Sequence, residues 1–565
     1  MAGTWIDEPM GLYIGWVERK NAFADGMPLR NSRGDRMLVF SGEDFSDHRV
    51  DQPLKDGVPS YLAQLSETDP HFPACLNGRF HGVVADRANG IAMLFNDRYG
   101  LHRLYYHQAK EAVYFAAEAK AILAVRPELR SLDPRSMGEF VAGGCVLENR
   151  TLFEGIHVLP CAAKWIIRNG GIEQRDVYFC PEEWEEQEVL APEAYYQELR
   201  EVFTRNLPRY FQSKEQIGLS LTGGLDTRMI LAWHKSAAGS LPCYTFGGMY
   251  RDCQDVIVAR KVAHACGQNH KVIEVGNEFL SLFPRYAERT VYLTDGCADV
   301  RRASDLYVNE RARQIAPVRM TGNYGSEVLR GLRAFKPVST IRGIFTPEVD
   351  TSLHRAEETY QSLVHGHLVS FAAFKQAPWH HYGLLALEQT QVSLRSPYLD
   401  NDLVRTAFRC PRSLRTTNDL CLRLIADGDA VLRQIPTDRD VGGVGVRGQL
   451  SRGMHQFLIK AEYAYDYGMP QWVAKIDHLL SPLHLERLFL GMQKFNHYRV
   501  WYRDSLAGYI RDMLLDPRTL CRPYLQRRHV EEMVQGHLKG DRNYTNEIHM
   551  VLTLELVHRL LIDSH

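Results

Sequence analysis

The sequence has 565 residues, of which 45% are hydrophobic and 24% are charged, with a formal net charge of −1. This length exceeds what one hydrophobic core organises, so we expect two or more domains. Near-neutrality argues against a nucleic-acid binder that works by bulk electrostatics, and no apolar run reaches the roughly 18 residues of a membrane span. The first 20 residues contain acidic side chains and no long apolar core, so we expect no signal peptide. The 11 cysteines form no C-x-x-C pair, which indicates reduced thiols in a cytoplasmic protein.

The first third of the chain is a series of short apolar runs separated by polar turns. The runs that read as strands are Gly11–Val17, Met37–Phe40, Gly82–Ala85, Ile91–Phe95 and Val113–Ala116. Short helices are expected at Tyr61–Leu65 and Ala117–Val125. Strands of this length with turns such as Arg87–Gly90 predict stacked antiparallel sheets.

Helices alternate with strands beyond about Pro192. The expected elements are a helix at Tyr195–Asn206, strands at Ile217–Leu221, Cys243–Gly248 and Lys271–Val275, and a helix at Asp255–Cys266. This order predicts parallel strands joined by right-handed crossovers, with ligands bound beyond the carboxyl ends of the strands.

Two amphipathic helices are predicted near the end of the chain, at Tyr498–Leu515 and Tyr544–Leu561. In the first, we expect Val500, Trp501, Leu506 and Ile510 to pack inward, because they share one helical face. A partner surface on the same segment is the alternative interpretation.

The most informative stretch is Leu219–Trp233, LSLTGGLDTRMILAW, in which an apolar strand runs through a glycine turn into a helix. Gly223 and Gly224 allow a ligand to approach the backbone closely, and a helix N-terminus favours an anion. Asp226 beside a phosphate would hold a divalent cation, and Thr222 and Thr227 add hydroxyl donors. Taken alone, the stretch is also compatible with a plain glycine turn between a buried strand and a helix.

This loop lacks the Gly-Lys-Ser/Thr ending of a P-loop, and it resembles the S-G-G-x-D-S loop of enzymes that adenylate a substrate and release pyrophosphate. Four motifs upstream resemble, in the right order, the glutaminase domain of glutamine-dependent asparagine synthetases. They are Leu76–Phe80 (L-N-G-x-F), Asn96–Tyr106 (R-D-R-x-G-x-x-P-L-Y-Y), Phe115–Ala121 (F-A-S-E-x-K-A) and Thr151–Pro160 (T-L-F-x-G-I-x-x-L-P).

The resemblance continues downstream of the loop. Asp255 and His270 fit the D-x-x-x-A-x-x-x-A-x-x-x-G-x-x-H spacing of the synthetase domain, Met320–Glu327 stands where that family has L-S-G-E-G-A-D-E, and Arg395–Asp400 resembles R-x-P-F-L-D. The resemblance implies an α/β plus α+β fold. Residues 1–181 would form a helix-flanked antiparallel β-sandwich of the Ntn glutaminase type, and residues 192–565 a parallel-sheet ATP-pyrophosphatase domain with added helices. Arg395 and Asp400 are expected to be structural organisers near the mouth of the site.

The first departure from the family concerns glutamine hydrolysis. The family nucleophile is an N-terminal cysteine, but the segment that matches C-G-I is Met10-Gly11-Leu12, and nine residues precede Met10. The family segment N-G-E, which supplies an oxyanion donor, appears as Ser41-Gly42-Glu43. We therefore expect no glutaminase activity and a first domain retained as a scaffold, as in the β-lactam synthetase and lasso-peptide cyclase type.

The second departure concerns the synthetase site. Ser326 replaces a family aspartate that helps to hold magnesium, which leaves Asp226 and Glu327 as the expected metal ligands, with Asp295 or Asp299 as alternatives. A family lysine that steadies the acyl-phosphate transition state is also missing, so Arg439 or Arg447 would supply that charge. Arginine cannot act as an acid or a base, so its role would differ from that of a lysine.

The resemblance implies ATP and Mg²⁺ as the bound groups. Leu219, Thr222, Gly223, Gly224, Asp226, Thr227 and Gly322 would surround the phosphates, Phe246 and Gly247 would flank the adenine, and Arg439, Glu327 and Arg447 would be catalytic. The leading hypothesis is an AMP-forming ligase that adenylates a small-molecule or peptide carboxylate and joins it to an amine. We expect the protein to be cytoplasmic, and a homodimer is a possible assembly. The alternatives are a nucleotide-binding pseudoenzyme or scaffold subunit, and an amidotransferase fed by an external glutaminase.

Overall fold

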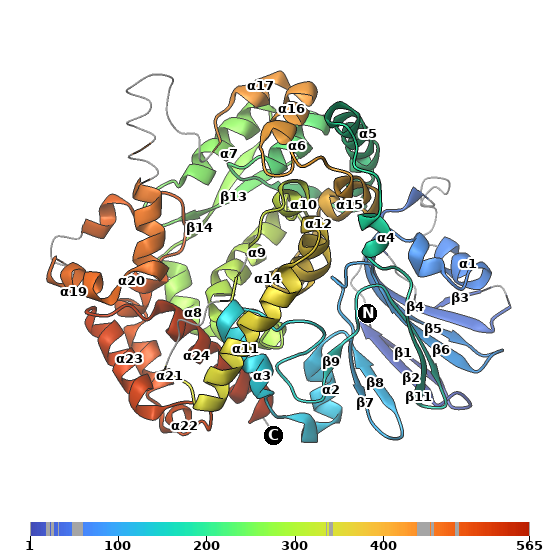
Figure 1. The fold of residues 1–565 in the computed structure, drawn as a ribbon, viewed down its shortest axis with the longest axis horizontal. Helices are drawn as coiled ribbons and strands as arrows, with labels where there is room; N and C mark the ends of the chain where they lie inside the picture. Colours follow the sequence, from blue (N-terminus) through green and yellow to red (C-terminus); the bar gives the residue numbers. More distant parts are fainter. Residues whose placement is uncertain are drawn as a thin grey trace.

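The computed structural model of the chain describes residues 2–17, 23, 27–31, 33–47, 60–334, 336–337, 343–437, 453, 457–480 and 485–563. Antiparallel strands form one side of the molecule, and a parallel sheet surrounded by helices forms the larger remainder (Figure 1). This arrangement confirms the predicted fold class. Of the helices that the structure describes, none combines the length and the apolar character that crossing a membrane requires.

The N-terminal part contains a six-stranded sheet, a three-stranded sheet and a two-stranded hairpin, all antiparallel. The six-stranded sheet has the order β11-β10-β6-β5-β4-β3, the three-stranded sheet β8-β7-β9, and the hairpin β1-β2. The strands are β1 Ala2–Asp7, β2 Leu12–Val17, β3 Leu29–Arg30, β4 Arg36–Asp44, β5 Gly78–Asp86, β6 Ile91–Asn96, β7 Tyr105–Gln108, β8 Val113–Ala116, β9 His157–Val158, β10 Ala163–Arg168 and β11 Gly171–Val177.

The six-stranded sheet is covered on both faces, which explains its nearly continuous apolar strands. One face packs with the hairpin, where Leu12 and Ile14 are buried and the alternate Tyr13 is exposed. The other face packs with α1, Ser60–Thr68, through Leu62. The remaining helices of this part are α2 Ala119–Val125, α3 Pro134–Gly143 and α4 Glu182–Glu185.

The larger part is organised around a five-stranded parallel sheet with the order β14-β13-β12-β15-β16. The strands are β12 Ile217–Ser220, β13 Cys243–Gly248, β14 His270–Val275, β15 Val318–Met320 and β16 Ser393–Arg395. The chain adds strands on one side of β12 and then returns to add β15 and β16 on its other side. A crevice is expected at such a reversal, beyond the carboxyl ends of β12 and β15.

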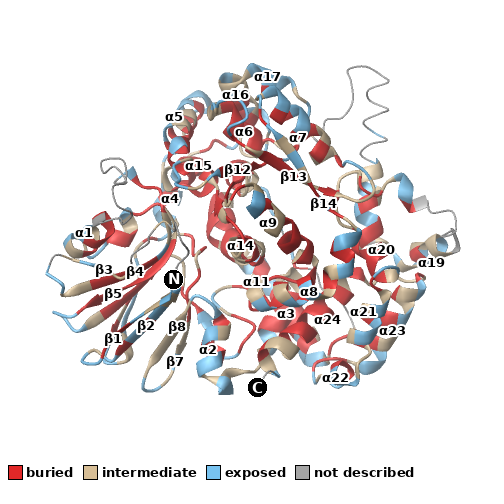
Figure 2. Cartoon of the chain, turned by 180° about the vertical axis from the view of Figure 1, so that it is seen from behind, coloured by how far each residue is buried: buried red, intermediate tan, exposed pale blue. Residues whose placement is uncertain are grey.

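Helices flank this sheet, and the last helices of the chain, α19 to α24, group together on one side of the molecule (Figure 2). They are α5 Pro192–Tyr210, α6 Asp226–Trp233, α7 Gln254–Ala265, α8 Asn277–Leu293, α9 Ala303–Ile315, α10 Gly325–Arg330, α11 Pro347–Val364, α12 Leu368–Phe371, α13 Ala377–Trp379, α14 Tyr382–Gln389, α15 Asn401–Phe408, α16 Asp419–Gly428, α17 Ala430–Gln434, α19 Gln471–Leu480, α20 Tyr498–Arg503, α21 Ala507–Leu514, α22 Pro517–Leu520, α23 Arg527–Lys539 and α24 Thr545–Val557.

The prediction of a single helix at Tyr498–Leu515 is wrong in one respect, because the segment forms two helices, α20 and α21. The backbone leaves the helical region at Asp504, with φ −105° and ψ −87°, and re-enters a helix after Leu506. The predicted inward face is confirmed, because Trp501, Leu506 and Ile510 are all buried. The predicted helix Tyr544–Leu561 ends as an α-helix at Val557 and continues as a π-helical turn.

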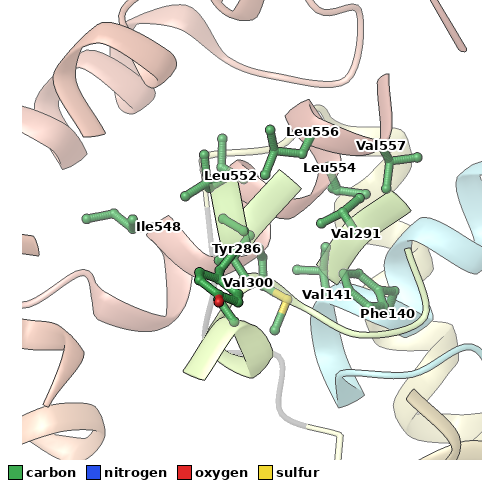
Figure 3. Close-up of a cluster of buried hydrophobic side chains, with 14 of the residues drawn as sticks. Phe140, Val141, Tyr286, Val291, Val300, Ile548, Leu552, Leu554, Leu556 and Val557 are labelled. Carbon is green, nitrogen blue, oxygen red and sulfur yellow. The ribbon is translucent and has the colours of Figure 1, made fainter. Parts of the chain in front are cut away.

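An apolar cluster joins the N-terminal part to the C-terminal helices. Phe140 and Val141 of α3 belong to the same buried cluster as Val291 of α8 and Val557 of α24 (Figure 3). Helix α3 also packs closely on α11, because a Cβ at Gly138 would lie 2.4 Å from the Cβ of Ser352. The two parts of the chain therefore share one core at this surface.

Charged and polar contacts join the same two parts near β16. Arg395 forms a two-oxygen ion pair with Glu43, with Nη2–Oε1 at 2.6 Å and Nε–Oε2 at 3.3 Å. Asp400 caps α15 and also accepts hydrogen bonds from Asn77 Nδ2 at 2.7 Å and Tyr210 OH at 3.0 Å. Arg395 and Asp400 are thus organisers that tie the parallel sheet to the N-terminal part.

Candidate active site

A cavity of about 380 Å³ lies at the reversal of strand order, beyond β12 and β15. Its volume falls in the range of small-ligand sites, roughly 300–1,000 Å³. The residues that line it come from the end of β12, the glycine loop (residues 221–227), the turn before α9, β15, the N-terminus of α10 and the segment from α13 to α14. They are Ser220, Thr222, Asp226, Thr227, Arg302, Arg319, Thr321, Gly322, Asn323, Tyr324, Ser326, Glu327, His380, His381, Leu384, Leu385 and Glu388.

The glycine loop connects β12 to α6, as predicted, and faces this cavity through Thr222, Asp226 and Thr227. The Gly223 amide donates to Asp255 Oδ1 at 2.8 Å, which holds the loop against the N-terminus of α7. Thr227 is 3% exposed, and its Oγ1 has no hydrogen-bond partner among the described residues. An unpartnered hydroxyl in a cavity wall suits a ligand acceptor. Leu219 is fully buried and supports the loop from behind.

The N-termini of α6 and α10 meet at two glycines. A Cβ at Gly322 would lie 2.8 Å from both the Asp226 Cβ and the Thr227 amide nitrogen. A Cβ at Gly325 would lie 2.8 Å from the Asp226 Cγ. Between these glycines, Tyr324 has a φ of +71°, so its backbone is strained. The close approach puts Asp226 next to α10, and this contact decides which groups Asp226 can bind.

Both carboxylate oxygens of Asp226 face donors from α10. The Ser326 hydroxyl donates to Oδ2 at 2.6 Å, and Arg330 Nη2 lies 3.4 Å from Oδ1. Arg330 Nη2 also donates to Ser326 Oγ. Burial raises the pKa of Asp226 to about 6, while the Arg330 charge and the Ser326 hydrogen bond oppose that rise.

These contacts do not fit a magnesium ion held by the protein. Mg²⁺ requires nearly octahedral oxygen ligands, but Asp226 is engaged by Ser326 and a guanidinium. The second predicted ligand, Glu327, lies 3.4 Å from His381 Nε2. Within the described ranges, no group of three His, Cys, Asp or Glu side chains is arranged to hold a metal ion.

The alternative carboxylates, Asp295 and Asp299, do not line the cavity. Asp295 accepts hydrogen bonds from the Ala119 amide and from Lys120 Nζ, at the packing surface with the N-terminal part. Asp299 pairs with Arg301. Neither carboxylate is therefore placed to act as a metal ligand where Ser326 stands instead of the aspartate expected from the resemblance.

A buried ion pair forms the part of the cavity wall next to the end of β12. Arg319 of β15 bonds to Glu388 Oε1 at 2.7 Å, Ser220 Oγ at 2.9 Å and Asn309 Oδ1 at 2.9 Å. Burial lowers the pKa of the nearby His380 to about 3, so its ring is neutral. These residues, like Arg330, are not among the predicted site residues. An arginine inside the apolar strand Val318–Met320 is the sequence signal that marks Arg319.

Two predicted adenine contacts lie outside the cavity wall. The Phe246 ring is 5.2 Å from the Arg319 guanidinium carbon and 6.1 Å from the Phe495 ring. Gly247 is buried, and a Cβ there would lie 2.7 Å from Val272. Phe246 and Gly247 are therefore not among the residues that line the cavity with Asp226 and Thr227.

The two predicted catalytic arginines, Arg439 and Arg447, lie outside the described residues. The chain that leads to them is anchored to the cavity by Arg228, which is 1% exposed. Arg228 Nη2 donates to Gly223 O and Pro436 O, both at 3.2 Å. This buried arginine is a further site-forming residue that the sequence did not reveal.

The two segments that resemble parts of a glutaminase site lie near different ends of the β4–β5 ladder, Met10 in the turn of the β1-β2 hairpin and Ser41 within β4. The Met10 amide donates a hydrogen bond to Asp7, and Asp7 forms an ion pair with Arg87. Arg87 directly follows Asp86, which pairs with Arg36 at one end of the β4–β5 ladder. Ser41 pairs with His81, five residues further along, which is about 17 Å at 3.3 Å per residue. Met10 therefore does not lie beside Ser41-Gly42-Glu43.

The Ser41 end of the sheet contains two neutral histidines. Ser41 Oγ lies 2.9 Å from His102 Nε2, and the His102 and His81 rings are 4.4 Å apart. Burial lowers the pKa of His81 to about 4 and that of His102 well below its usual value.

Comparisons with known proteins match two family models in succession. Residues 20–179 match a glutamine amidotransferase domain, and residues 198–392 match asparagine synthase. Asparagine synthetase [glutamine-hydrolyzing] 1 of Bacillus subtilis is 21% identical over 348 residues, which cover 59% of this chain and 54% of that protein. The asparagine synthetase [glutamine-hydrolyzing] of Mus musculus is 25% identical over 218 residues, 36% of each chain.

These matches span about half or less of the relatives' own length. Among solved structures, a glutamine phosphoribosylpyrophosphate amidotransferase from B. subtilis covers 46% of this chain and 76% of its own, with 10% identity and a TM-score of 0.23. A TM-score this low supports no conclusion about the fold.

Proposed function

Because a glutamine amidotransferase domain followed by an asparagine synthase domain makes this chain a member of the asparagine synthetase superfamily, we propose that it is an ATP-dependent, AMP-forming amide ligase. Its substrates would be a carboxylate and an amine. The observation that carries the proposal is the cavity at the strand reversal, which the glycine loop and the N-terminus of α10 enclose together.

The reaction that suits this cavity proceeds in two displacements. A substrate carboxylate oxygen attacks the α-phosphorus of ATP and pyrophosphate leaves. The amine nitrogen then attacks the acyl carbon, and AMP leaves as the amide forms and the nitrogen loses a proton. The unpartnered Thr227 hydroxyl and the N-terminus of α6 would hold the departing pyrophosphate. The Arg319–Glu388 pair would fix the adjoining wall through its bond to Ser220 Oγ.

We propose that the amine does not come from glutamine hydrolysis in the first domain. Met10 has no thiol, and the segment that matches the family oxyanion donor lies near a different end of the β4–β5 ladder. The amine would then be free ammonia or an amine on the substrate itself, as in a cyclase of specialised metabolism. Residues 1–181 would serve as a scaffold for residues 192–565 through Glu43–Arg395 and Asn77–Asp400.

The test is pyrophosphate release from the purified protein with ATP and Mg²⁺, across a panel of carboxylates, each with and without amines. We expect release that depends on one class of carboxylate. Thr227→Val keeps the shape of the side chain but removes the hydroxyl, and we expect it to lower kcat/KM by roughly tenfold. Thr204→Val, whose hydroxyl bonds only locally within α5 at an exposed position, is the matched control and should not change the rate.

A nucleotide-binding pseudoenzyme or scaffold subunit is the second candidate. The observation that favours it is that both oxygens of Asp226 already face Ser326 and Arg330. ATP binding without pyrophosphate release for any carboxylate would support this candidate over the ligase.

A further inference from the structure

We propose that Arg330 is a built-in counter-ion at the phosphate site, which takes the place of a metal ion at Asp226. The inference rests on the proposed nucleotide site, but it concerns the charge balance of that site rather than the reaction. Nucleotide phosphates would then bind beside a carboxylate whose charge is already compensated. Any divalent cation would arrive with the phosphates and would not be held by Asp226.

The position of Arg330 is fixed from two directions. Its Nη1 donates to Asn418 Oδ1 at 2.7 Å, at the N-terminus of α16. Its Nη2 faces Asp226 Oδ1 and Ser326 Oγ. The side chain is 15% exposed, so its charge acts on Asp226 with little screening by solvent. A guanidinium held in this way is a permanent part of the site.

The same contacts exclude a metal ion from the carboxylate. A divalent cation on Asp226 Oδ1 would lie next to the guanidinium, and the two like charges would repel in a buried environment. A cation on Oδ2 would have to displace the Ser326 hydroxyl, which donates at 2.6 Å. Neither oxygen of Asp226 is therefore available to a metal ion without breaking a contact with α10.

The sequence of α10 is consistent with this exchange of roles. Ser326 and Arg330 are four residues apart, so they share one face of the helix. Ser326 stands where the resembling family has an aspartate, so one negative charge is lost from the site. Arg330 places a positive charge on the same face. The site therefore contains a single carboxylate from this loop, Asp226, with a guanidinium beside it.

The first test uses Mn²⁺ alone as a spectroscopic probe of metal binding to the whole protein without nucleotide. We expect the wild-type protein to show no bound Mn²⁺ up to about 1 mM, whereas Ser326→Asp/Arg330→Gln should gain a site that Asp226→Asn removes. Wild-type protein that binds Mn²⁺ tightly, and loses it in Asp226→Asn, would overturn the proposal.

The second test measures ATP binding by calorimetry, and the sign of the effect of Asp226→Asn decides it. If Asp226 held a metal ion, Asp226→Asn would weaken binding of Mg²⁺-ATP. If Arg330 compensates Asp226, the substitution removes a negative charge near the phosphates and should tighten binding severalfold. Arg330→Gln should weaken binding at least tenfold, and Arg330→Lys by less.

Arg333→Gln is the matched control, because it removes a positive charge three residues away that contacts Phe371 and not Asp226. It should change ATP affinity less than twofold. Weaker binding in Asp226→Asn would contradict the proposal. Failure of the wild-type protein to bind ATP at all would count against the proposed function instead, since the Mn²⁺ test needs no nucleotide.

Discussion

The ion pair between Glu43 and Arg395 allows a quantitative test of how the N-terminal part is held. The Arg395 side chain is 5% exposed and that of Glu43 is 17% exposed, so the pair is largely removed from water. Glu43→Gln would leave the guanidinium buried without its carboxylate. Breaking one partner of a buried pair costs about 3–5 kcal/mol.

The lower end of this range applies here because other acceptors remain. Arg395 Nη1 also donates to Tyr210 O at 2.9 Å and to Gln212 O at 2.8 Å, and these carbonyls stay in place in the variant. We therefore expect Glu43→Gln to destabilise the protein by about 3 kcal/mol. Replacing both partners, as in Glu43→Leu/Arg395→Met, should cost less than Glu43→Gln, because no unpaired charge stays buried.

The assay is urea unfolding followed by tryptophan fluorescence, with Glu193→Gln as the control. Glu193 pairs with Arg423 through two oxygens as well, but the side chains are 63% and 46% exposed. Its loss should destabilise the protein far less than the loss of the buried pair, because water screens exposed charges. If Glu43→Gln were no more destabilising than Glu193→Gln, the argument that this pair anchors the N-terminal part would be refuted.

Three further outcomes are expected. Gly138→Val should loosen the α3–α11 contact and lower the thermal midpoint of unfolding, since even a Cβ at Gly138 would lie 2.4 Å from the Cβ of Ser352. Gly508→Val is the control for a general effect of valine in a helix, because a Cβ at Gly508 meets nothing within 4 Å. Buried His81, with its pKa lowered to about 4, binds no proton when the unfolded chain does, so stability should fall by up to about 3 kcal/mol as the pH drops from 6.5 to 4, and His81→Phe should reduce that slope in urea unfolding. Incubation with glutamine should release no glutamate above background, and glutamate formation that Ser41→Ala abolishes would contradict the proposed inactivity.

The parts of the fold that are local in sequence could be predicted. The glycine loop, the strand before it and the helix after it follow from apolar runs and turn residues within about 15 positions, and β8 matches its predicted bounds. The break between α20 and α21 could not be predicted, because Asp504 to Leu506 do not interrupt the amphipathic pattern that marks a helix. Packing, rather than pattern, decides where that helix ends.

The site was predictable as a loop but not as a set of contacts. Asp226 and Thr227 face the cavity as expected, but the groups that bind Asp226 come from α10, about 100 positions later. No spacing rule connects Arg330 to Asp226. The resemblance to a family drew attention to the carboxylate missing at Ser326, and it gave no reason to look at the guanidinium of Arg330.

The shared cluster of α3 and α24 has a consequence for synthesis of the chain. Val557 belongs to the same cluster as Phe140 but is synthesised roughly 400 residues later. At about 5–20 residues per second, roughly 20–80 s pass between the synthesis of Phe140 and that of Val557, so the cluster stays incomplete for that time. During that interval the nascent chain presents an uncovered apolar surface to chaperones and to neighbouring chains. A product that stops before Thr545 would lack α24 and leave its part of the cluster uncovered, so we expect such a product to aggregate.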